Sequence, residues 1–370
     1  MSSALAVVVE PENTPAEDRQ TPTASPCRIT GLSADRQAEW DVYVASHPEG
    51  TLFHTVAWRG AVKDAFGHQD IYLVALREDR IVGALPMFLM ASRIAGRILV
   101  SVPYGVGGGI IADDHAATAG LFDAAKRIAH QRRCSAIDLR SERAVLPDIP
   151  VVDRYVGFRR EMPDHADDVP GWLPRKARAA ARNARRKYRL AVSFGDEHLH
   201  EAWTLYSISM RRLASLTYPL AFFERLLAHT PDRHWVSIVQ WNGRSVAGLV
   251  TFLFNGSVMP YFIGTTDNAR QCSAANLIYL TAMERGVECG YRIFDFGRSR
   301  RDNTGSYDFK RFNGFQPRPL GYQYYTAPGH STPDLSPSNP KFRLARRLWA
   351  HLPLWVTRTL GARVARHIPG

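Results

Sequence analysis

Several residues whose side chains could take part in catalysis or ligand binding lie in the segment IFDFGRSRRDNTGSYDFKRF, residues 293–312. Asp295 stands between two phenylalanines, which predicts either a carboxylate aimed into a site or a structural aspartate that caps the following turn. Lys310 lies among aromatic residues, where burial of an ammonium group is costly unless the group has partners or a function. Arg298 and Tyr307 add polar groups, and Tyr307 fits either ligand contact or a helix start. A carboxylate and an amine together can move a proton or hold developing charge.

The segment GTTDNARQCSAANL, residues 264–277, follows a predicted strand and opens a predicted helix. Helix N-termini bind anions through their free N–H groups and the helix dipole. Asp267, Arg270, Ser273 and Ala275 are the candidate ligand-binding residues of this segment. The alternative is an ordinary loop in which Asp267 or Ser273 caps the helix.

A basic helix is predicted over WLPRKARAAARNARRKYRL, residues 172–190, which holds eight Lys or Arg and no acid. Arginines recur at spacings of three and four along one face, and alanines occupy the opposite face. A merely solvated helix usually alternates charge signs, and guanidinium groups match phosphate or carboxylate geometry. We therefore weigh an anion-binding face against a solvated basic helix. The candidate substrate-binding residues are Lys176, Arg178, Arg182 and Arg185.

Common catalytic and binding motifs are missing from the sequence. No P-loop occurs, and GVGGGI at 105–110 has Ile110 where a dinucleotide fingerprint needs its third glycine. The His200-Glu201 pair lacks the second histidine of a zinc protease helix, and no GxSxG elbow is present. The four cysteines form no CxxC pair, which favours a reducing compartment. P-loop, metal, hydrolase and dinucleotide classes are therefore excluded, and we predict no metal site.

Two domains are predicted from the length of 370 residues and from an internal repeat. In the second half, Asn242-Gly243 and Asn255-Gly256 join three β-rich runs, and Asn-Gly predicts tight hairpins. Helices are predicted before each meander at 34–46, 55–66, 196–216 and 220–229. A further helix is predicted after each meander, at about 116–131 and 274–289, and it leads into a short buried strand. Each half is thus an α/β unit of order α-α-β-β-β-α-β, with a ligand cleft expected between the halves.

The predicted domain organisation is a disordered tail at 1–27, an N-terminal unit at 28–163, a C-terminal unit at 164–328, and a linker with basic helices at 329–370. The net charge of +12 is concentrated, because 172–190 and 341–370 together hold 15 of the 47 basic residues and no acid. The segment 341–370 predicts two short helices broken at Pro353. Basic residues with tryptophans indicate docking on an anionic membrane surface. The alternative is a helix packed across the protein body.

These features together resemble a known family. The segments LPRKARAAARNARRKYRL, PYFIGTTDNARQCSAANLIYLTAMERGVECGYRIFDFGRS and YDFKRFNGF are similar to FemAB-related acyltransferases of the GNAT fold. Within that group, the sequence and its tail NPKFRLARRLWAHLPLWVTRTLGARVARHIPG resemble the branch associated with exosortase/PEP-CTERM systems of Gram-negative bacteria. The resemblance covers roughly residues 28–370. It implies two tandem GNAT-like domains that pass an acyl or aminoacyl group to an amine, in exopolysaccharide or cell-envelope assembly.

The places of three candidate residues in the predicted strands and in the loop that follows them suggest roles in this chemistry. Asp295 would orient or deprotonate the acceptor amine, while Lys310 and Tyr261, on the third strand of the second meander, would position the acyl donor. The GNAT pyrophosphate loop, Q/R-x-x-G-x-G/A, is matched by Arg270, Ser273 and Ala275, with Ser273 in place of the central glycine. Acyl-CoA and aminoacyl-tRNA are the candidate donors, with no tightly bound cofactor. The sequence lacks the charged helical hairpin that Fem ligases use around tRNA, so aminoacyl-tRNA is disfavoured.

The expected acceptor is an anionic small molecule or a glycan- or lipid-linked compound, and no DNA partner is expected. The expected location is the cytoplasm, with peripheral contact to the inner membrane through 341–370. Two rival functions have different signatures. A non-catalytic protein that holds an anionic polymer or RNA on its arginine helix would bind polyanions in a salt-sensitive manner. A CoA-dependent acetyltransferase of small amines would bind coenzyme A saturably.

Overall fold

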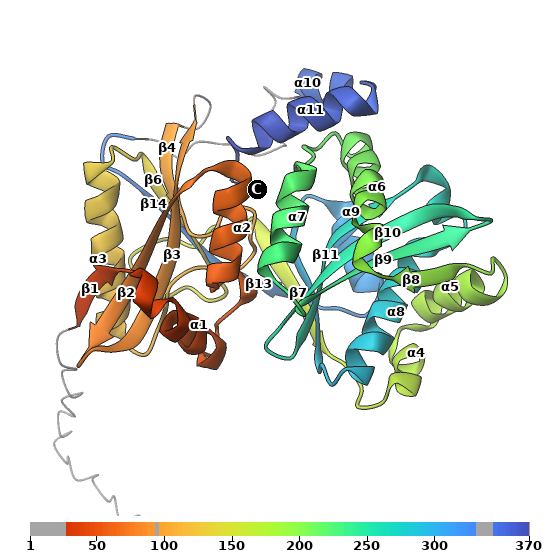
Figure 1. Ribbon diagram of the computed structural model, residues 1–370, viewed down its shortest axis with the longest axis horizontal. Coiled ribbons are helices and arrows are strands. Elements are labelled where there is room, and N and C mark those ends of the chain that lie inside the picture. Colours follow the sequence, from red (N-terminus) through yellow and green to blue (C-terminus); the bar gives the residue numbers. More distant parts are fainter. Residues whose placement is uncertain (1–26, 93–95, 331–342, 370) are drawn as a thin grey trace, which may run out of the picture.

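Two mixed β-sheets with flanking helices form the described part of the chain, residues 27–92, 96–330 and 343–369 of a computed structural model (Figure 1). The first sheet has the order β1 (Arg28–Gly31), β2 (Gln69–Arg77), β3 (Arg80–Ser92), β4 (Gly96–Val100), β6 (Ala136–Ser141) and β14 (Gly321–Thr326), with β5 (Ile111–Ala112) on β3. The second has the order β13 (Pro317–Pro319), β7 (Tyr155–Glu161), β12 (Ile293–Arg300), β11 (Ser257–Thr265), β10 (Arg244–Phe254), β9 (His234–Trp241) and β8 (Ala191–Phe194).

Eleven α-helices are described alongside the sheets. They are α1 (Gln37–Ser46), α2 (Val56–Phe66), α3 (His115–Gln131), α4 (Val169–Trp172), α5 (Arg175–Arg186), α6 (Leu199–Arg212), α7 (Leu220–His229), α8 (Ala274–Glu288), α9 (Thr304–Phe312), α10 (Arg343–Trp349) and α11 (Leu354–Ala365). The predicted mixed α/β fold with two tandem units is confirmed. The repeat reads α1-α2-β2-β3-β4-α3-β6 in the first half and α6-α7-β9-β10-β11-α8-β12 in the second.

The two Asn-Gly hairpins of the second half form as their turn chemistry predicts. Asn242 and Gly243 have φ values of 50° and 71°, and Asn255 and Gly256 have values of 43° and 69°. A type I′ turn needs positive φ at both central residues, which asparagine and glycine tolerate. The flanking residues pair directly, Arg244 with Trp241 and Phe254 with Ser257.

One predicted helix is shorter in the structure, and strands cross the predicted division between the two units. The helix predicted over 196–216 is a short 3₁₀ turn at Asp196–His198 followed by α6, which ends at Arg212. Ala214 then has a φ of 51°, a left-handed conformation that cannot continue an α-helix. The division at 163/164 remains a prediction, but the sheets cross it: β7 precedes it and pairs with β12, whereas β14 lies far beyond it and pairs with β6. Each half therefore contributes a strand to the sheet of the other.

A shared aromatic core joins the halves. Trp58 on α2 is fully buried, and its ring makes edge contacts with Phe222 on α7 and Phe252 on β10, at centroid distances of 6.0 and 6.3 Å. Helices α2 and α7 pack against each other where the halves meet (Figure 1). Because these large side chains are buried on both sides, the relative position of the halves is part of the core packing.

The break predicted at Pro353 is confirmed, since Pro353 directly precedes α11. The disordered tail predicted at 1–27, apart from Cys27, and residues 331–342 and 370 of the predicted linker and basic segment lie outside the described residues. No described helix combines the length and the apolar character needed to cross a bilayer.

Candidate active site

Asp295 lies at an irregularity of β12 close to the junction of the halves. Strand β12 pairs with β7 through Asp295 and again from Arg298, and between them Gly297 has a φ of 64°. Such a bulge re-aims the side chains beside it. The Asp295 carboxylate accepts a hydrogen bond from the Gly297 N–H at 2.7 Å. The turn-capping role and the site role predicted for Asp295 are therefore compatible, because one oxygen caps the bulge and the other accepts no hydrogen bond from the described residues.

The surroundings of Asp295 shift the pKa of its carboxyl group. Burial raises the pKa of Asp295, while the Gly297 hydrogen bond and the charges of Arg159, Lys310 and Arg318 oppose that rise. A carboxyl group with a raised pKa is a stronger base when ionised than an ordinary aspartate. Perturbed titrating groups of this kind mark candidate functional sites.

Lys310 reaches the same bulge from α9 and is only 8% exposed. Its Nζ donates to the carbonyl oxygens of Phe296, Gly297 and Arg298 at 2.8, 3.4 and 2.9 Å. These three acceptors match the three N–H bonds of an ammonium group. Burial lowers the pKa of Lys310 to about 7, against the attraction of Asp295. Lys310 therefore fastens the bulge and places a titratable cation beside Asp295.

Glu142, which sequence reasoning missed, adds a second carboxyl group from the other half. It follows β6, and its pKa is raised by burial and then by the charge of Asp295. The accessible surface nevertheless shows Glu142 as exposed, so we attribute its raised pKa mainly to the neighbouring carboxylate. The internal repeat could have pointed to Glu142. Strands β6 and β12 are equivalent in the two halves, and their carboxyl ends meet at the junction.

A glycine-rich loop borders these carboxyl groups. Residues 105–110 were excluded as a dinucleotide motif, and in the structure Gly107, Gly108 and Gly109 line a small hollow with Glu142. A side chain at Gly109 would come within 1.9 Å of the Ser141 hydroxyl, so only glycine fits there.

His54 holds this loop and is unsuited to act as a base. Its Nδ1 accepts from the Thr51 backbone N–H at 3.2 Å, and its Nε2 then donates to the Gly109 carbonyl at 3.0 Å. Burial lowers the pKa of His54 to about 4. A neutral histidine whose ring nitrogens are both engaged positions the loop and leaves proton transfer to the carboxyl groups.

Tyr261 and Arg298 also reach the junction. The Tyr261 hydroxyl donates to the Tyr104 carbonyl of the other half at 2.5 Å, and burial raises its pKa. Tyr261 therefore ties the halves together. The Arg298 guanidinium lies over the rings of Tyr155 and Tyr322 at 4.6 and 5.7 Å. Among the described residues no carboxylate pairs with it at salt-bridge distance.

The segment predicted to bind a pyrophosphate retains part of that geometry. Ser273 has a φ of 57°, the left-handed conformation that explains why the GNAT motif places glycine at this position. The Ser273 side chain makes no capping bond to α8. Asp267 forms an ion pair with Arg212 at 2.9 Å. Arg270 is exposed, and Ala275 lies in the first turn of α8.

The parallel strands β11 and β12 pair only at their beginnings. Ser257 pairs with Ile293 and Val258 with Phe294, and no later pair joins the two strands. Backbone groups along the facing edges beyond these pairs lack a partner strand, and an extended ligand can use such groups.

The arginine helix α5 has the two faces predicted for it. Ala177, Ala181 and Ala184 are buried, and α5 packs on α8. Lys176 and Arg182 are exposed, Arg178 donates to the Gly171 carbonyl at 3.4 Å, and Arg185 pairs with Glu284 at 2.6 Å. Figure 1 shows α5 on the side of the second half that faces away from the first. The charges that act on Asp295 come from Arg159, Lys310 and Arg318, and none of these residues belongs to α5.

Tyr307, the remaining candidate, lies on α9 and packs against β7. Its ring makes an edge contact with Phe158 at 5.4 Å, and Arg311 lies 5.9 Å from its centre.

Substitution of Arg182 by glutamate tests the anion-binding role of α5. We expect binding of a polyanion such as heparin to weaken by about 1.5–3 kcal/mol, the range for a charge-assisted hydrogen bond. Titration calorimetry at two salt concentrations measures this change, and Arg127→Glu on α3 is the charge-matched control. If both variants bind like the wild type, the helix is only a solvated basic surface.

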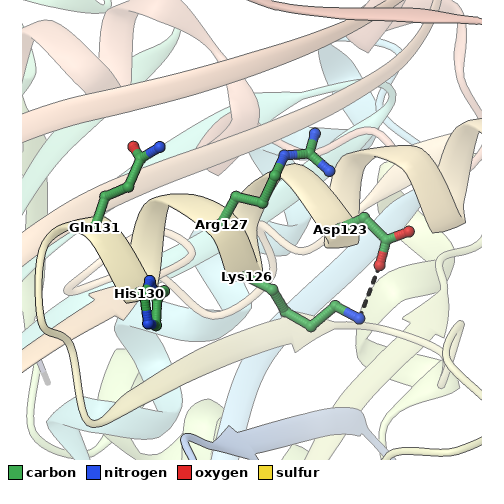
Figure 2. Close-up of a pocket in the computed structure, with 5 residues that line it drawn as sticks. All are labelled: Asp123, Lys126, Arg127, His130 and Gln131. Carbon is green, nitrogen blue, oxygen red and sulfur yellow. Dashed lines mark ion pairs between the residues drawn. The ribbon is translucent and has the colours of Figure 1, made fainter.

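A wide hollow on the first half does not have the features of a binding site. Figure 2 shows its lining residues, Asp123, Lys126, Arg127, His130 and Gln131, which all come from one face of α3. Lys126 pairs with Asp123 at 2.7 Å. Long polar side chains from a single helix do not converge on a ligand, in contrast to the groups at the junction.

Comparison with known proteins identifies the fold. Residues 174–311 match the family described as acetyltransferase (GNAT) domain. FemX is 15% identical, with a TM-score of 0.63 over 86% of this chain and 100% of FemX. A tandem GNAT protein from the clavulanic acid biosynthesis pathway is 13% identical, with a TM-score of 0.54 over 81% of this chain and 98% of that one. A conserved protein of unknown function from Bacteroides thetaiotaomicron is 11% identical, with a TM-score of 0.50 over 80% and 98%.

These likenesses define a tandem GNAT-like fold, as the sequence predicted. The domain match covers the second half, which carries β11, α8 and β12. A comparison of the sequence with curated proteins finds no match.

Proposed function

We propose that this protein is an N-acyltransferase that moves an acyl or aminoacyl group onto an amine at the junction of its halves. The observation that carries the proposal is the position of Lys310, a buried amine held on the β12 bulge beside Asp295. Burial of this ammonium group costs free energy, which indicates a functional role for Lys310. The match to a GNAT domain supports acyl transfer as that function.

The reaction needs a base for the acceptor. The amine nitrogen attacks the donor carbonyl carbon, and the bond from that carbon to the leaving thiol or alcohol breaks. The ammonium proton must leave the nitrogen, and the ionised Asp295 carboxylate, with Glu142 nearby, accepts it. The leaving group takes up a proton in turn. Lys310 supplies positive charge next to Asp295 and maintains the bulge that aims it.

We assign donor binding to the edges of β11 and β12 beyond their last pair, and to the loop before α8. Backbone N–H groups of β11 that face β12 beyond Val258 can bind an extended acyl chain and the oxyanion that forms on the carbonyl. Arg270 and the start of α8 offer positive charge to a pyrophosphate. Both features support acyl-CoA as the donor.

Calorimetric titration with acetyl-CoA tests the donor assignment. We expect saturable binding that Arg270→Glu weakens about tenfold or more, because the change replaces an attractive charge with a repulsive one. Arg127→Glu is the matched control and should bind like the wild type. Absence of saturable binding would contradict acyl-CoA as the donor and leave aminoacyl-tRNA to be tested. Turnover with simple amines would favour a small-amine acetyltransferase.

The sequence resemblance supports a proposal for the biological substrate. We propose an anionic, glycan-linked or lipid-linked acceptor in exopolysaccharide or envelope assembly associated with an exosortase/PEP-CTERM system. Comparison of envelope polysaccharide composition between a deletion strain and its complemented parent tests this proposal, and identical N-acylation in both strains would contradict it. A non-catalytic role in polyanion binding is the second candidate, favoured by the exposed Arg182 face of α5.

A further inference from the structure

The segment containing α10 and α11 is fastened along one side to the second half. On α10, the Arg346 guanidinium donates to the carbonyls of Leu213 and Ala214, both at 3.4 Å, and the Trp349 indole N–H donates to the Ser215 carbonyl at 3.0 Å. On α11, Gly361 lies against Thr217 so closely that a Cβ atom would come within 3.0 Å of the Thr217 nitrogen. These contacts give the segment an inner side with a defined orientation.

The end of the segment is fastened to the first half. Arg366 donates to the Phe66 carbonyl at 3.2 Å. The Pro369 carbonyl accepts from the Tyr104 backbone N–H at 2.8 Å and from Arg140 at 3.1 Å. Figure 1 shows both helices along one edge of the molecule, above α6 and α7. Because both ends are held, the outer side of the segment faces solvent in a fixed orientation.

That outer side is apolar and basic. Leu348, Trp355 and Leu360 are 60%, 71% and 41% exposed, and the adjoining Leu213 is 57% exposed. Four of the seven large apolar side chains that are exposed in the described residues therefore belong to α10, α11 and the adjoining Leu213. Arg347 and Arg363 are also exposed, and 341–370 contains no acidic residue. We name Leu213, Arg347, Leu348, Trp355, Leu360 and Arg363 the outer tail surface.

We propose that the outer tail surface docks this protein onto an anionic phospholipid membrane. The exposed indole of Trp355 and the exposed leucines are unfavourable in water. Their burial at the boundary between lipid head groups and acyl chains is favourable and would stabilise the bound state. The arginines between them match anionic head groups in sign. The inner contacts keep this surface formed without lipid, so docking needs no refolding. This inference is independent of the proposed acyl transfer.

A lipid surface fits these residues better than a nucleic acid or a second copy. Affinity for nucleic acids comes mainly from basic side chains that contact phosphates, and exposed leucines do not contribute to it. A second copy would bring the same arginines into one interface without acidic partners, and like charges then repel. Flotation with vesicles distinguishes these partners.

The test uses the full chain with vesicles of phosphatidylcholine alone or mixed with phosphatidylglycerol. We expect the wild type to float with the anionic vesicles and to remain in solution with the neutral ones. Trp355→Ser should lower the partition coefficient roughly tenfold, and Arg363→Glu about fivefold for each unit of positive charge removed. Val42→Ser, at a side chain 69% exposed on α1, and Arg127→Glu are the matched controls and should not change it.

Several outcomes would overturn the proposal. They are no flotation of the wild type, equal flotation on both vesicle types, and flotation of the Trp355 and Arg363 variants at the wild-type level. Sedimentation velocity and RNA binding are measured on the same samples. A dimer or an RNA complex that these variants disrupt, without any vesicle binding, would assign the surface to that partner instead.

Discussion

Asp295→Asn is expected to lower the rate of acyl transfer by about 10²–10⁴-fold, the usual effect of losing a general base. The amide oxygen of asparagine can still accept the Gly297 N–H bond, so the bulge should remain. Thiol release from the acyl donor and complementation of a deletion strain measure the loss. Glu142→Gln serves as the paired variant, since it removes the other carboxyl group while Asp295 stays in place.

The same variant has a predicted effect on stability. Burial raises the folded-state pKa of Asp295 above its unfolded value, so the folded protein binds more protons than the unfolded chain between those two values. Stability of the wild type therefore falls as pH rises through this window. Asp295→Asn removes that penalty, and its melting temperature at neutral pH should equal or exceed that of the wild type. Full activity in this variant would mean that Asp295 only caps the bulge.

Lys310→Met is expected to lower the transfer rate by about 10²-fold or more, because it removes a preorganised charge from the site. The carbonyl oxygens of Phe296 and Arg298 lose their donor, and each buried group left unpaired costs about 1–3 kcal/mol. Thermal denaturation should show the loss in stability. Lys187→Met, at an exposed lysine beyond α5, is the matched control.

The pH dependence of the rate separates a functional Lys310 from a merely structural one. Its charge lowers the pKa of Asp295, so the methionine variant should have a higher Asp295 pKa. The acid limb of the pH–rate profile should therefore move to higher pH. A variant with reduced stability but an unchanged acid limb would show that Lys310 only fastens β12.

Local patterns in the sequence predicted much of the fold correctly. Asn242-Gly243 and Asn255-Gly256 specify their turns through the positive φ values that these residues tolerate. The spacing of alanine and arginine on α5 predicted which face is buried. Both predictions succeed because turn geometry and helical period depend on neighbours within a few residues. The internal repeat also predicted the tandem fold, because segments with the same order of elements form units of the same fold.

The composition of the candidate site depended on contacts between distant segments. The sequence identified Asp295 and Lys310 by their aromatic neighbours, but the bond from Lys310 to three carbonyls of β12 exists only because α9 folds back over the bulge. Glu142 has no local signal as a titrating group, and its pKa is raised by burial and then by the charge of Asp295 on the other half. The donor-positioning role of Tyr261 stays a prediction, and the structure adds a hydrogen bond from its hydroxyl to the Tyr104 carbonyl that the sequence did not indicate.

Burial and charge proximity are set by which surfaces pack together, and that packing joins residues more than a hundred positions apart. The exchange of β7 and β14 between the sheets has the same origin, because a strand pairs with the edge that lies beside it in space. Local chemistry thus determined the turns, the helix faces and the repeated unit from the sequence alone. Only the tertiary structure decided which carboxyl, amine and hydroxyl groups meet at the junction.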